Sequence, residues 1–510
     1  MLGWDRVRSA SETMRPAMLL LWIMGAALLP MALAGQENSA VSVGKDLVRV
    51  DSPVSALEHV RVIDGTGAPA KPDQTIVISE GKIVAIEDSD SIKVPENAKR
   101  LDFTGHTALP GLVGMHDHLF YVTTEVNDNY VAHDMPFSFP RLFLANGVTT
   151  IRTTGSYEPY ADLEIKRAID QGKMIGPKIN VTGPYLVDGK FEQIQLHKPN
   201  GPEQIQIHKL SGPEDAVRTV NYWADEGMTS FKAYAYISRA ELKAAIEAAH
   251  KRGLTLAGHL CSIGFREAAE MGIDSLEHGL FVDTEFDPAK RPDVCPENDW
   301  PARVDPEVDS EQVRQTIDSL VKHHVAVTST LPIIEKSLSP PPDVRQVILE
   351  SLGVDALKSS QEFQLRKSRE ANDESKRDEI RHFAQRYHKE MQFEVAFVRA
   401  SGLLMAGSDA VLGDVIAGFA DQREIELLVE TGFTPVEAIK IATLNGAQFL
   451  KQAAHIGSLA VGKQADIVLV KGDPSTDIQD IENVQVVFKD GVGYDSKKLI
   501  ESVRGQVGIR

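Results

Sequence analysis

The chain contains 510 residues, of which 42% are hydrophobic and 25% are charged, a balance typical of a large folded protein rather than a disordered one. Its formal net charge of −19 excludes broad electrostatic binding to nucleic acid or to an anionic membrane surface. Only two cysteines occur, Cys261 and Cys295, which excludes a disulfide-rich scaffold. Whether these two form one bridge or remain free thiols is left open by the sequence.

The N-terminal segment has the layout of a secretory signal peptide. Arg6, Arg8 and Arg15 precede an apolar segment over 17–33, and small residues suited to a cleavage site end it at Ala34. We predict that residues 1–34 are removed on export, which places the protein in the periplasm or outside the cell without a stable membrane anchor. A retained membrane anchor is the alternative.

Short β-branched runs dominate both ends of the remaining chain. Residues 47–105 contain such runs, including two that flank the hairpin-like turn at 80–82, and similar runs recur at 465–470 and 484–491. Neither end can bury an apolar face alone. We therefore predict that segments 45–105 and 455–510 pair into one small β-sandwich domain.

Between these ends, over 106–454, short apolar strands alternate with helical stretches such as Glu241–Arg252. This alternation predicts an α/β fold with a parallel sheet, and eight strand–helix units predict a (β/α)8 TIM barrel. The predicted strands end near the following residues: His118, Thr153, Gly183, Tyr234, His259, His278, Thr330 and Asp409.

Two insertions interrupt the regular spacing, at about 188–213 and 340–400. The first contains a near-repeat of eleven residues over 192–213, which we interpret as a β-hairpin flap; a disordered surface duplication is the alternative. The second is charged and helical, including 373–399, and we expect it to pack outside the barrel, as a lid or as a contact in a homo-oligomer.

Metal-binding side chains occupy the predicted strand ends. His116 and His118 are two residues apart, so on a strand they project to the same face, as two ligands of one divalent cation require. Further candidates close the later strands, namely Lys232, His259, His278 and Asp409. In a barrel the C-terminal strand ends carry the chemistry, so this pattern predicts a metal site there.

From about 47 to 495 the chain resembles the amidohydrolase superfamily, in the binuclear, metal-dependent branch that includes prolidase-like and imidazolonepropionase-related hydrolases. The resemblance is carried by the strand-end motifs above and by the typical tail segments: Leu109-Pro110-Gly111-Leu112-Val113-Gly114-Met115-His116-Asp117-His118, Gly147-Val148-Thr149-Thr150-Ile151-Arg152, Gly407-Ser408-Asp409, Asn445-Gly446-Ala447 and 457–468. The six candidate ligands occur in the order typical of that superfamily.

The resemblance implies a site with two divalent ions, for which zinc fits the mixed ligand set best. His116, His118 and Asp409 would hold the more buried ion, and His259 and His278 the other. Lys232 would bridge both ions as a carbamate, and a bridging hydroxide would attack the scissile carbonyl. Asp409 would take the proton and pass it to the leaving nitrogen.

Glu277 flanks His278 and by strand alternation would point away from the site, so no catalytic role is assigned to it. Candidates for holding a substrate carboxylate or the developing oxyanion are Tyr234, Tyr121 and Arg152, with His197 from the predicted flap. The chain also departs from many relatives, which carry aspartate where Gly114 stands.

The sequence therefore predicts a metal-dependent hydrolase that cleaves a C–N amide bond in a dipeptide or an N-acyl amino acid. Hydrolysis of a lactone or a phosphotriester by the same binuclear site is the alternative. A barrel that only binds or scaffolds is disfavoured, because all six ligand positions are retained.

Overall fold

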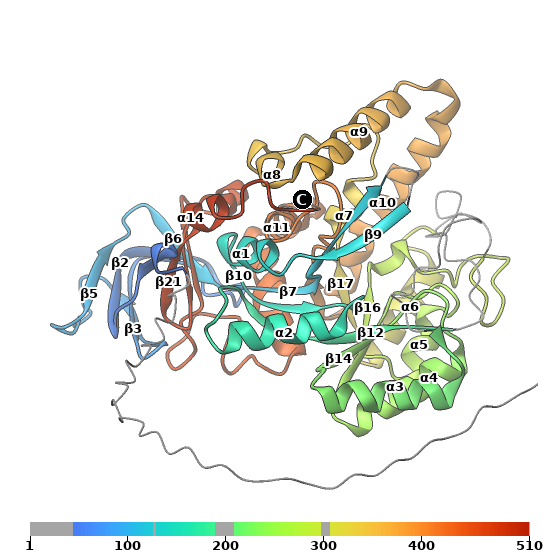
Figure 1. Cartoon of the computed structure of the whole chain (residues 1–510), viewed down its shortest axis with the longest axis horizontal. Coiled ribbons are helices and arrows are strands. Elements are labelled where there is room, and N and C mark those ends of the chain that lie inside the picture. The colour runs from blue at the N-terminus through green and yellow to red at the C-terminus, as the bar shows by residue number, and fades with distance from the viewer. Residues whose placement is uncertain (1–43, 126–128, 189–208, 297–305, 509–510) are drawn as a thin grey trace, which may run out of the picture. The chain divides into compact units, whose positions relative to one another are not determined.

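A computed structural model describes residues 44–125, 129–188, 209–296 and 306–508 (Figure 1). The predicted signal peptide at 1–34, His197 and most of the near-repeat at 192–213 lie outside these ranges. Over the ranges that are described, no helix is both long and apolar enough to cross a bilayer.

Strands from the two ends of the chain share one nine-stranded sheet, ordered β1-β21-β20-β19-β6-β2-β3-β4 with β5 beside β2. β19 pairs antiparallel with β6, and β1 pairs antiparallel with β21, so strands from both ends of the chain lie side by side in one sheet. The sheet's members are β1 (Val48–Val50), β2 (Val54–Val62), β3 (Lys71–Ser79), β4 (Lys82–Asp88), β5 (Lys99–Asp102), β6 (His106–Pro110), β19 (Ile467–Lys471), β20 (Val484–Lys489) and β21 (Val492–Asp495).

The local sequence explains the turn between β3 and β4. Glu80 and Gly81 both have positive φ, of 50° and 74°, which is the backbone of the tight turn that joins two antiparallel strands with the correct twist. The predicted hairpin between β3 and β4 is thus confirmed. The sheet has a core of its own, to which both chain ends contribute, for example Leu57, Ile76, Ile467 and Phe488.

The middle of the chain forms a mixed α/β structure with two parallel sheets, ordered β11-β10-β7 and β13-β12-β14-β15-β16-β17-β18. Their strands are β7 (Leu112–Asp117), β10 (Val148–Thr153), β11 (Lys178–Asn180), β12 (Thr182–Asp188), β13 (Lys209–Leu210), β14 (Ser230–Ala233), β15 (Thr255–Gly258), β16 (Ser275–Glu277), β17 (Ala326–Ser329) and β18 (Leu404–Ala406). Most predicted strand ends match within three residues; the third predicted strand is instead split into β11 and β12 and runs on to Asp188.

The ladders do not close into the single eight-stranded sheet that the sequence predicts, because hydrogen bonding is irregular at two seams. Between β10 and β12, the backbone N–H of Thr182 donates to the side-chain oxygen of Thr153 at 2.9 Å instead of to a carbonyl. Between β18 and β7, the N–H groups of Ser408 and Asp409 both donate to the carbonyl of His116, at 3.1 and 2.8 Å.

Helices follow the parallel strands, as predicted. Helix α4 (Arg239–Lys251) matches the predicted helix at 241–252, and it begins at Ser238 because Ser238 and Glu241 form a capping box. The others are α1 (Ser138–Ala145), α2 (Pro159–Asp170), α3 (Pro213–Glu226), α5 (Phe265–Met271), η2 (Gly279–Phe281), α6 (Glu311–Lys322), α7 (Leu331–Glu335), α11 (Phe419–Thr431), α12 (Pro435–Lys440), η4 (Ile441–Asn445) and α13 (Gly446–Phe449).

The second insertion is helical, as its composition predicts. It contains α8 (Gln346–Ser351), α9 (Val354–Ala371), η3 (Glu374–Lys376) and α10 (Arg377–Arg399), and α9 and α10 project as an arm in Figure 1. The C-terminal half of α10 is buried through residues such as Phe393 and Phe397, whereas α9 buries little. The remaining elements are η1 (Lys45–Leu47), the antiparallel hairpin β8 (Phe120–Glu125) and β9 (Asn129–Asp134), η5 (Ile478–Glu482) and α14 (Ser496–Glu501).

The question left open for the two cysteines is answered by the structure. Cys261 and Cys295 form a disulfide, with their Cα atoms 5.0 Å apart. Cys261 lies two residues beyond His259, so the bond ties the segment that follows β15 to the segment near 295.

Candidate metal centre

Each of the six predicted ligands lies at or just beyond the C-terminal end of a parallel strand. His116 is the penultimate residue of β7 and His118 follows that strand, while Lys232 lies within β14. His259, His278 and Asp409 stand shortly after the ends of β15, β16 and β18. Parallel strands present these ends at one edge, so residues nearly three hundred positions apart meet there.

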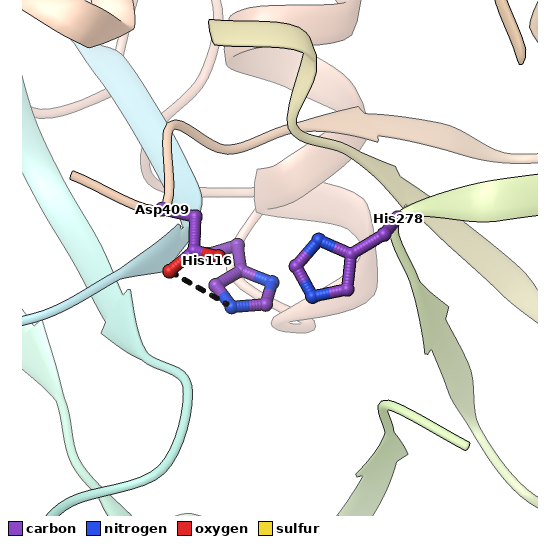
Figure 2. A group of neighbouring side chains, drawn as sticks. All are labelled: His116, His278 and Asp409. Atoms are coloured by element: carbon purple, nitrogen blue, oxygen red, sulfur yellow. Dashed lines mark ion pairs between the residues drawn. The ribbon is translucent and has the colours of Figure 1, made fainter. Parts of the chain in front are cut away.

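The side chains converge. Single ligand atoms of His116, His278 and Asp409 all lie within 4.8 Å of one another, and Figure 2 shows His278 approaching the other two from the opposite side. Nε2 of His118 lies 3.2 Å from Oδ1 of Asp409. The ring of His259 lies 4.6 Å from that of His278, centre to centre.

Lys232 lies among these side chains and not at the surface. Its Nζ atom is 3.0 Å from Nε2 of His116, and the residue is only 2% exposed. A buried amine therefore lies beside imidazoles, with the Asp409 carboxylate in the same cluster. We refer to these six residues as the metal-centre cluster.

Hydrogen bonds orient three of the imidazoles. Nδ1 of His116 faces a carboxylate oxygen of Glu277 at 2.8 Å, Nδ1 of His118 faces the carbonyl of Gly155 at 3.2 Å, and Nδ1 of His278 faces the hydroxyl of Thr330 at 2.7 Å. With Nδ1 engaged in each ring, the Nε2 lone pairs remain for a cation. The donor set therefore fits a divalent metal.

Burial lowers the pKa values of the histidines and of the lysine in the metal-centre cluster. Burial lowers the pKa of His116 to about 4 and lowers the pKa values of His118, His259 and His278 as well, so the rings stay neutral. Burial also lowers the pKa of Lys232 to about 8, so its amine loses a proton more readily than that of an exposed lysine.

Asp409 stays ionised within the cluster. Burial alone would raise its pKa, but the neighbouring imidazoles of His116 and His118 outweigh that effect and hold the pKa well below its usual range. Its side chain keeps 19% exposure, so the carboxylate is reachable from solvent. Neutral imidazoles and an anionic carboxylate are the protonation states in which these groups bind metal.

A glycine is required at position 407, where the chain after β18 approaches His116 on β7. A Cβ atom on Gly407 would lie 2.4 Å from Cβ of His116 and 2.6 Å from its backbone nitrogen. Any side chain at position 407 would therefore push β18 away from the strand that carries His116. The glycine before Ser408 and Asp409 is explained by this close approach.

The expectation that Glu277 points away from the site is wrong. Strand β16 ends at Glu277, and His278 then adopts a left-handed backbone with φ of 66°, which breaks the alternation on which that expectation depended. Both side chains consequently reach the site. Burial alone would raise the pKa of Glu277, but Arg152 and His116 hold that pKa below its usual range. The ionised carboxylate therefore accepts a hydrogen bond from Nδ1 of His116.

Two residues expected to bind substrate are engaged elsewhere. Arg152 is 1% exposed and donates to the carbonyl of Met115 at 2.8 Å and to Glu277 at 2.9 Å, so it lies behind His116 and supports it. Tyr121 is also 1% exposed, and its hydroxyl donates to the carbonyl of Gly413 at 2.8 Å. Neither presents a free polar group to a substrate.

Tyr234 belongs to a set of rings beside the metal-centre cluster. Consecutive ring centres lie 4.6 to 5.2 Å apart along the path His118, Phe120, Tyr157, Tyr185, Tyr234 and His259. We call Phe120, Tyr157, Tyr185 and Tyr234 the aromatic wall. Of its members, the sequence identifies only Tyr234; Tyr157 and Phe120 follow β10 and β7 without any periodic signal.

Comparison with known proteins agrees with this geometry. A family model described as the amidohydrolase family matches residues 107–493. Among curated relatives, an adenine deaminase of Listeria innocua is 33% identical over 84 residues, 16% of this chain and 14% of that protein. Adenine deaminase 2 of Jannaschia sp. is 32% identical over 84 residues, with the same shares. The match thus spans a small part of those relatives.

Solved structures share the fold over most of the chain. A Xaa-Pro dipeptidase with bound methionine has a TM-score of 0.61 at 20% identity, covering 87% of this chain and 100% of the other. A putative prolidase from Bifidobacterium longum has a TM-score of 0.59 at 23% identity, covering 88% and 98%. A. niger ochratoxinase has a TM-score of 0.62 at 19% identity, covering 87% and 95%. By the match of its family model and by its fold, the chain belongs to the amidohydrolase family.

Proposed function

We propose that the protein hydrolyses a C–N amide bond of a dipeptide or an N-acyl amino acid at a binuclear metal centre. One observation carries this proposal: four histidines, one buried lysine and one ionised aspartate from five parallel strands converge on a single cluster. Membership of the amidohydrolase family supports the same reaction class.

We infer that the two parallel sheets together form one (β/α)8 barrel. The hydrogen bonds at both seams support this, since Thr153 contacts Thr182 at one seam and His116 contacts Ser408 and Asp409 at the other. The barrel interpretation explains why all six ligands meet, because chemistry in such barrels is located at the C-terminal strand ends.

The residues would hold two divalent cations, which we propose are zinc: His116, His118 and Asp409 for one, His259 and His278 for the other, with a carbamate on Lys232 between them. When bound, the cations would lower the pKa of water and polarise the scissile carbonyl. Asp409 would accept the proton of the attacking water and deliver it to the leaving nitrogen, a contribution of about 10²–10⁴-fold.

The aromatic wall is the side of the site on which we place the substrate. Its four rings border the metal-centre cluster between His118 and His259, and no basic side chain belongs to it. Rings of this kind bind flat or apolar groups over large areas. Tyr234 retains its predicted substrate-binding role within this wall, whereas His197 remains a prediction.

Export to an oxidising compartment is also part of the proposal. The disulfide between Cys261 and Cys295 supports it, because such bonds persist outside the reducing cytosol. The signal peptide predicted at 1–34 is the corresponding sequence feature.

Matched substrates test the reaction class. Purified protein supplied with Zn²⁺ is assayed against a panel of dipeptides and N-acyl amino acids, a lactone and an organophosphate triester. Faster hydrolysis of an amide than of either ester is expected. A kcat/KM that is higher for the lactone or the triester than for every amide would replace amide hydrolysis by the alternative reaction.

Substitution in the aromatic wall tests the substrate position. Tyr157→Leu should raise KM for the best amide while leaving metal content unchanged, since Tyr157 is not one of the proposed ligands. Tyr222→Leu, at an exposed tyrosine on α3, is the control and should change neither value. An unchanged KM in Tyr157→Leu would remove the wall from the binding site.

A further inference from the structure

Asp117 stands between the two histidines of β7 but takes no part in the metal-centre cluster. Strand alternation turns its side chain to the face opposite His116 and His118, where it is fully buried. There its Oδ1 atom accepts a hydrogen bond of 2.7 Å from the hydroxyl of Ser408. Ser408 directly precedes Asp409, so this bond joins the two segments that supply ligands to one proposed cation.

The backbone joins the same two segments a second time. The N–H groups of Ser408 and Asp409 both donate to the carbonyl of His116. Asp409 itself has φ of 47°, a left-handed conformation that is unfavourable for a residue other than glycine. Such a conformation persists only where the surroundings hold it, and Ser408 is the neighbour with a side chain anchored across the seam.

The carboxyl group of Asp117 lies in the space that Gly114 leaves open beside Asp421. A Cβ atom on Gly114 would lie 1.8 Å from Oδ2 of Asp117 and 3.1 Å from Oδ1 of Asp421, so both carboxyl groups occupy the place of the missing side chain. Asp421 is fixed in turn, since its other oxygen accepts the backbone N–H of Gly418 at the start of α11. The departure at Gly114 from relatives that carry aspartate there has this physical explanation.

We propose that the Ser408–Asp117 hydrogen bond, backed by Asp421, is a positioning device that sets the distance between Asp409 and the His116–His118 pair. The inference rests on the proposed metal centre and extends it to residues that touch neither cation nor substrate. Hydrogen-bonded partners of this kind typically change metal affinity or activity by about 10- to 100-fold when they are removed.

The choice of variants separates positioning from plain stability. Ser408→Ala removes the donor, and Ser408→Thr retains a hydroxyl at the same position. Ser496→Ala is the matched control, because Ser496 is also buried and donates one hydrogen bond of 2.7 Å, to the carbonyl of Ala145. Asp117→Asn provides a second route, since it preserves shape but puts an NH₂ group in place of one of the two buried carboxyl oxygens.

Metal affinity is the first readout and does not require any substrate. Each apoprotein is titrated with Co²⁺ in competition with a chromophoric chelator, and the visible spectrum of the bound Co²⁺ reports ligand geometry. Ser408→Ala should bind Co²⁺ at least tenfold more weakly and with an altered spectrum. Ser408→Thr should recover most of the affinity, and Ser496→Ala should match the wild type in both respects.

The kinetic readout is the second. In Ser408→Ala under saturating metal, kcat should fall while KM for the best amide stays within about twofold, because the device acts on Asp409 and not on the aromatic wall. If Ser408→Ala and Asp117→Asn both bind Co²⁺ with the affinity and the spectrum of the wild type, the proposal is overturned. If the wild type binds two Co²⁺ ions but hydrolyses no amide, the proposed function fails while the Co²⁺ comparison still decides the positioning role.

The melting temperatures of the apoproteins show whether a variant is simply unfolded. Ser408→Ala and Ser496→Ala each lose one buried hydrogen bond, so similar decreases in melting temperature are expected for the two. A Ser408→Ala protein that is unfolded at the assay temperature, together with an Asp117→Asn protein that is folded and binds Co²⁺ normally, would also overturn the proposal.

Discussion

Nδ1 of His116 lies 2.8 Å from Oε2 of Glu277, and the other oxygen of that carboxylate accepts a 2.9 Å bond from Arg152. All three residues are at most 1% exposed. Because Glu277 is ionised there, the proton of the neutral imidazole lies on Nδ1, and Nε2 is left as the ligand atom. A carboxylate that fixes the tautomer of a ligating histidine also increases its basicity.

Glu277→Gln should therefore weaken metal binding. The amide can still accept from His116 through its oxygen, but its NH₂ group then meets the guanidinium of Arg152, donor against donor. A loss of about 10- to 100-fold in Zn²⁺ affinity is expected, measured by chelator competition. The matched control is Glu241→Gln, a buried glutamate in the capping box of α4 that glutamine can also form. Equal affinity in the two variants would contradict the role assigned to Glu277.

The metal content of the purified protein is a direct test of the binuclear centre. Elemental analysis after dialysis against Zn²⁺ should give about two equivalents per chain, because the proposed centre divides the four histidines and Asp409 between two ions that share Lys232. Removal with a strong chelator should abolish hydrolysis, and added Zn²⁺ should restore it. A value of one equivalent or less in fully active protein would reject the bridged pair.

Lys232→Ala should abolish activity, because the carbamate that we propose as the oxygen donor between the two cations is lost. Short carboxylates such as acetate or propionate should restore part of the rate, since the truncation leaves room for them in a buried site. The same additives should not restore His259→Ala, which lacks an imidazole and not a carboxylate. Turnover of Lys232→Ala near the wild-type rate would remove Lys232 from the centre.

The positions of the metal-centre cluster were predictable because each of its residues lies at or near the end of an apolar strand. His116 and His118 also share a face through simple alternation. The pairing of the two chain ends was likewise predictable, because neither the strands before 105 nor those after 465 could bury an apolar face alone.

The supporting residues could not be predicted in the same way. Glu277 reaches the site only because His278 has a positive φ, and the sequence carries no signal for that conformation. Arg152 is an arginine on a predicted strand, and its partner Glu277 is 125 residues away, so only the fold brings them together. Tyr157 and Tyr185 lie on a loop and a strand that bear no ligand, and their place in the aromatic wall depends on ring contacts alone.

Asp409→Asn should reduce kcat far more than it changes KM. The amide cannot accept the proton of the attacking water, so the loss should be about 10²–10⁴-fold in kcat. Ser408, His116 and the wall remain in place, so substrate affinity should be nearly unchanged. Because asparagine is also a poorer metal ligand, the assay is made at saturating Zn²⁺ with metal content measured in the same sample. A variant with full metal content that differs from the wild type only in KM would contradict the role of Asp409 as a base.

Replacement of both Cys261 and Cys295 by serine should destabilise the protein without removing its metal ligands. The bond closes a loop with a sequence separation of 34 residues, for which the chain-entropy relation gives a stabilisation of about 3–4 kcal/mol. The double variant should lose up to that amount in free energy of unfolding, measured by urea denaturation without reductant. Reductant should lower the stability of the wild type and leave the double variant unchanged, which separates loss of the disulfide from loss of packing around the two sulfur atoms.

Since Cys261 lies two residues from His259, weaker Zn²⁺ binding in the double variant would further show that the bond helps to hold that ligand. Equal unfolding free energies for the wild type and the double variant would mean that the bond constrains the unfolded chain far less than its loop length predicts.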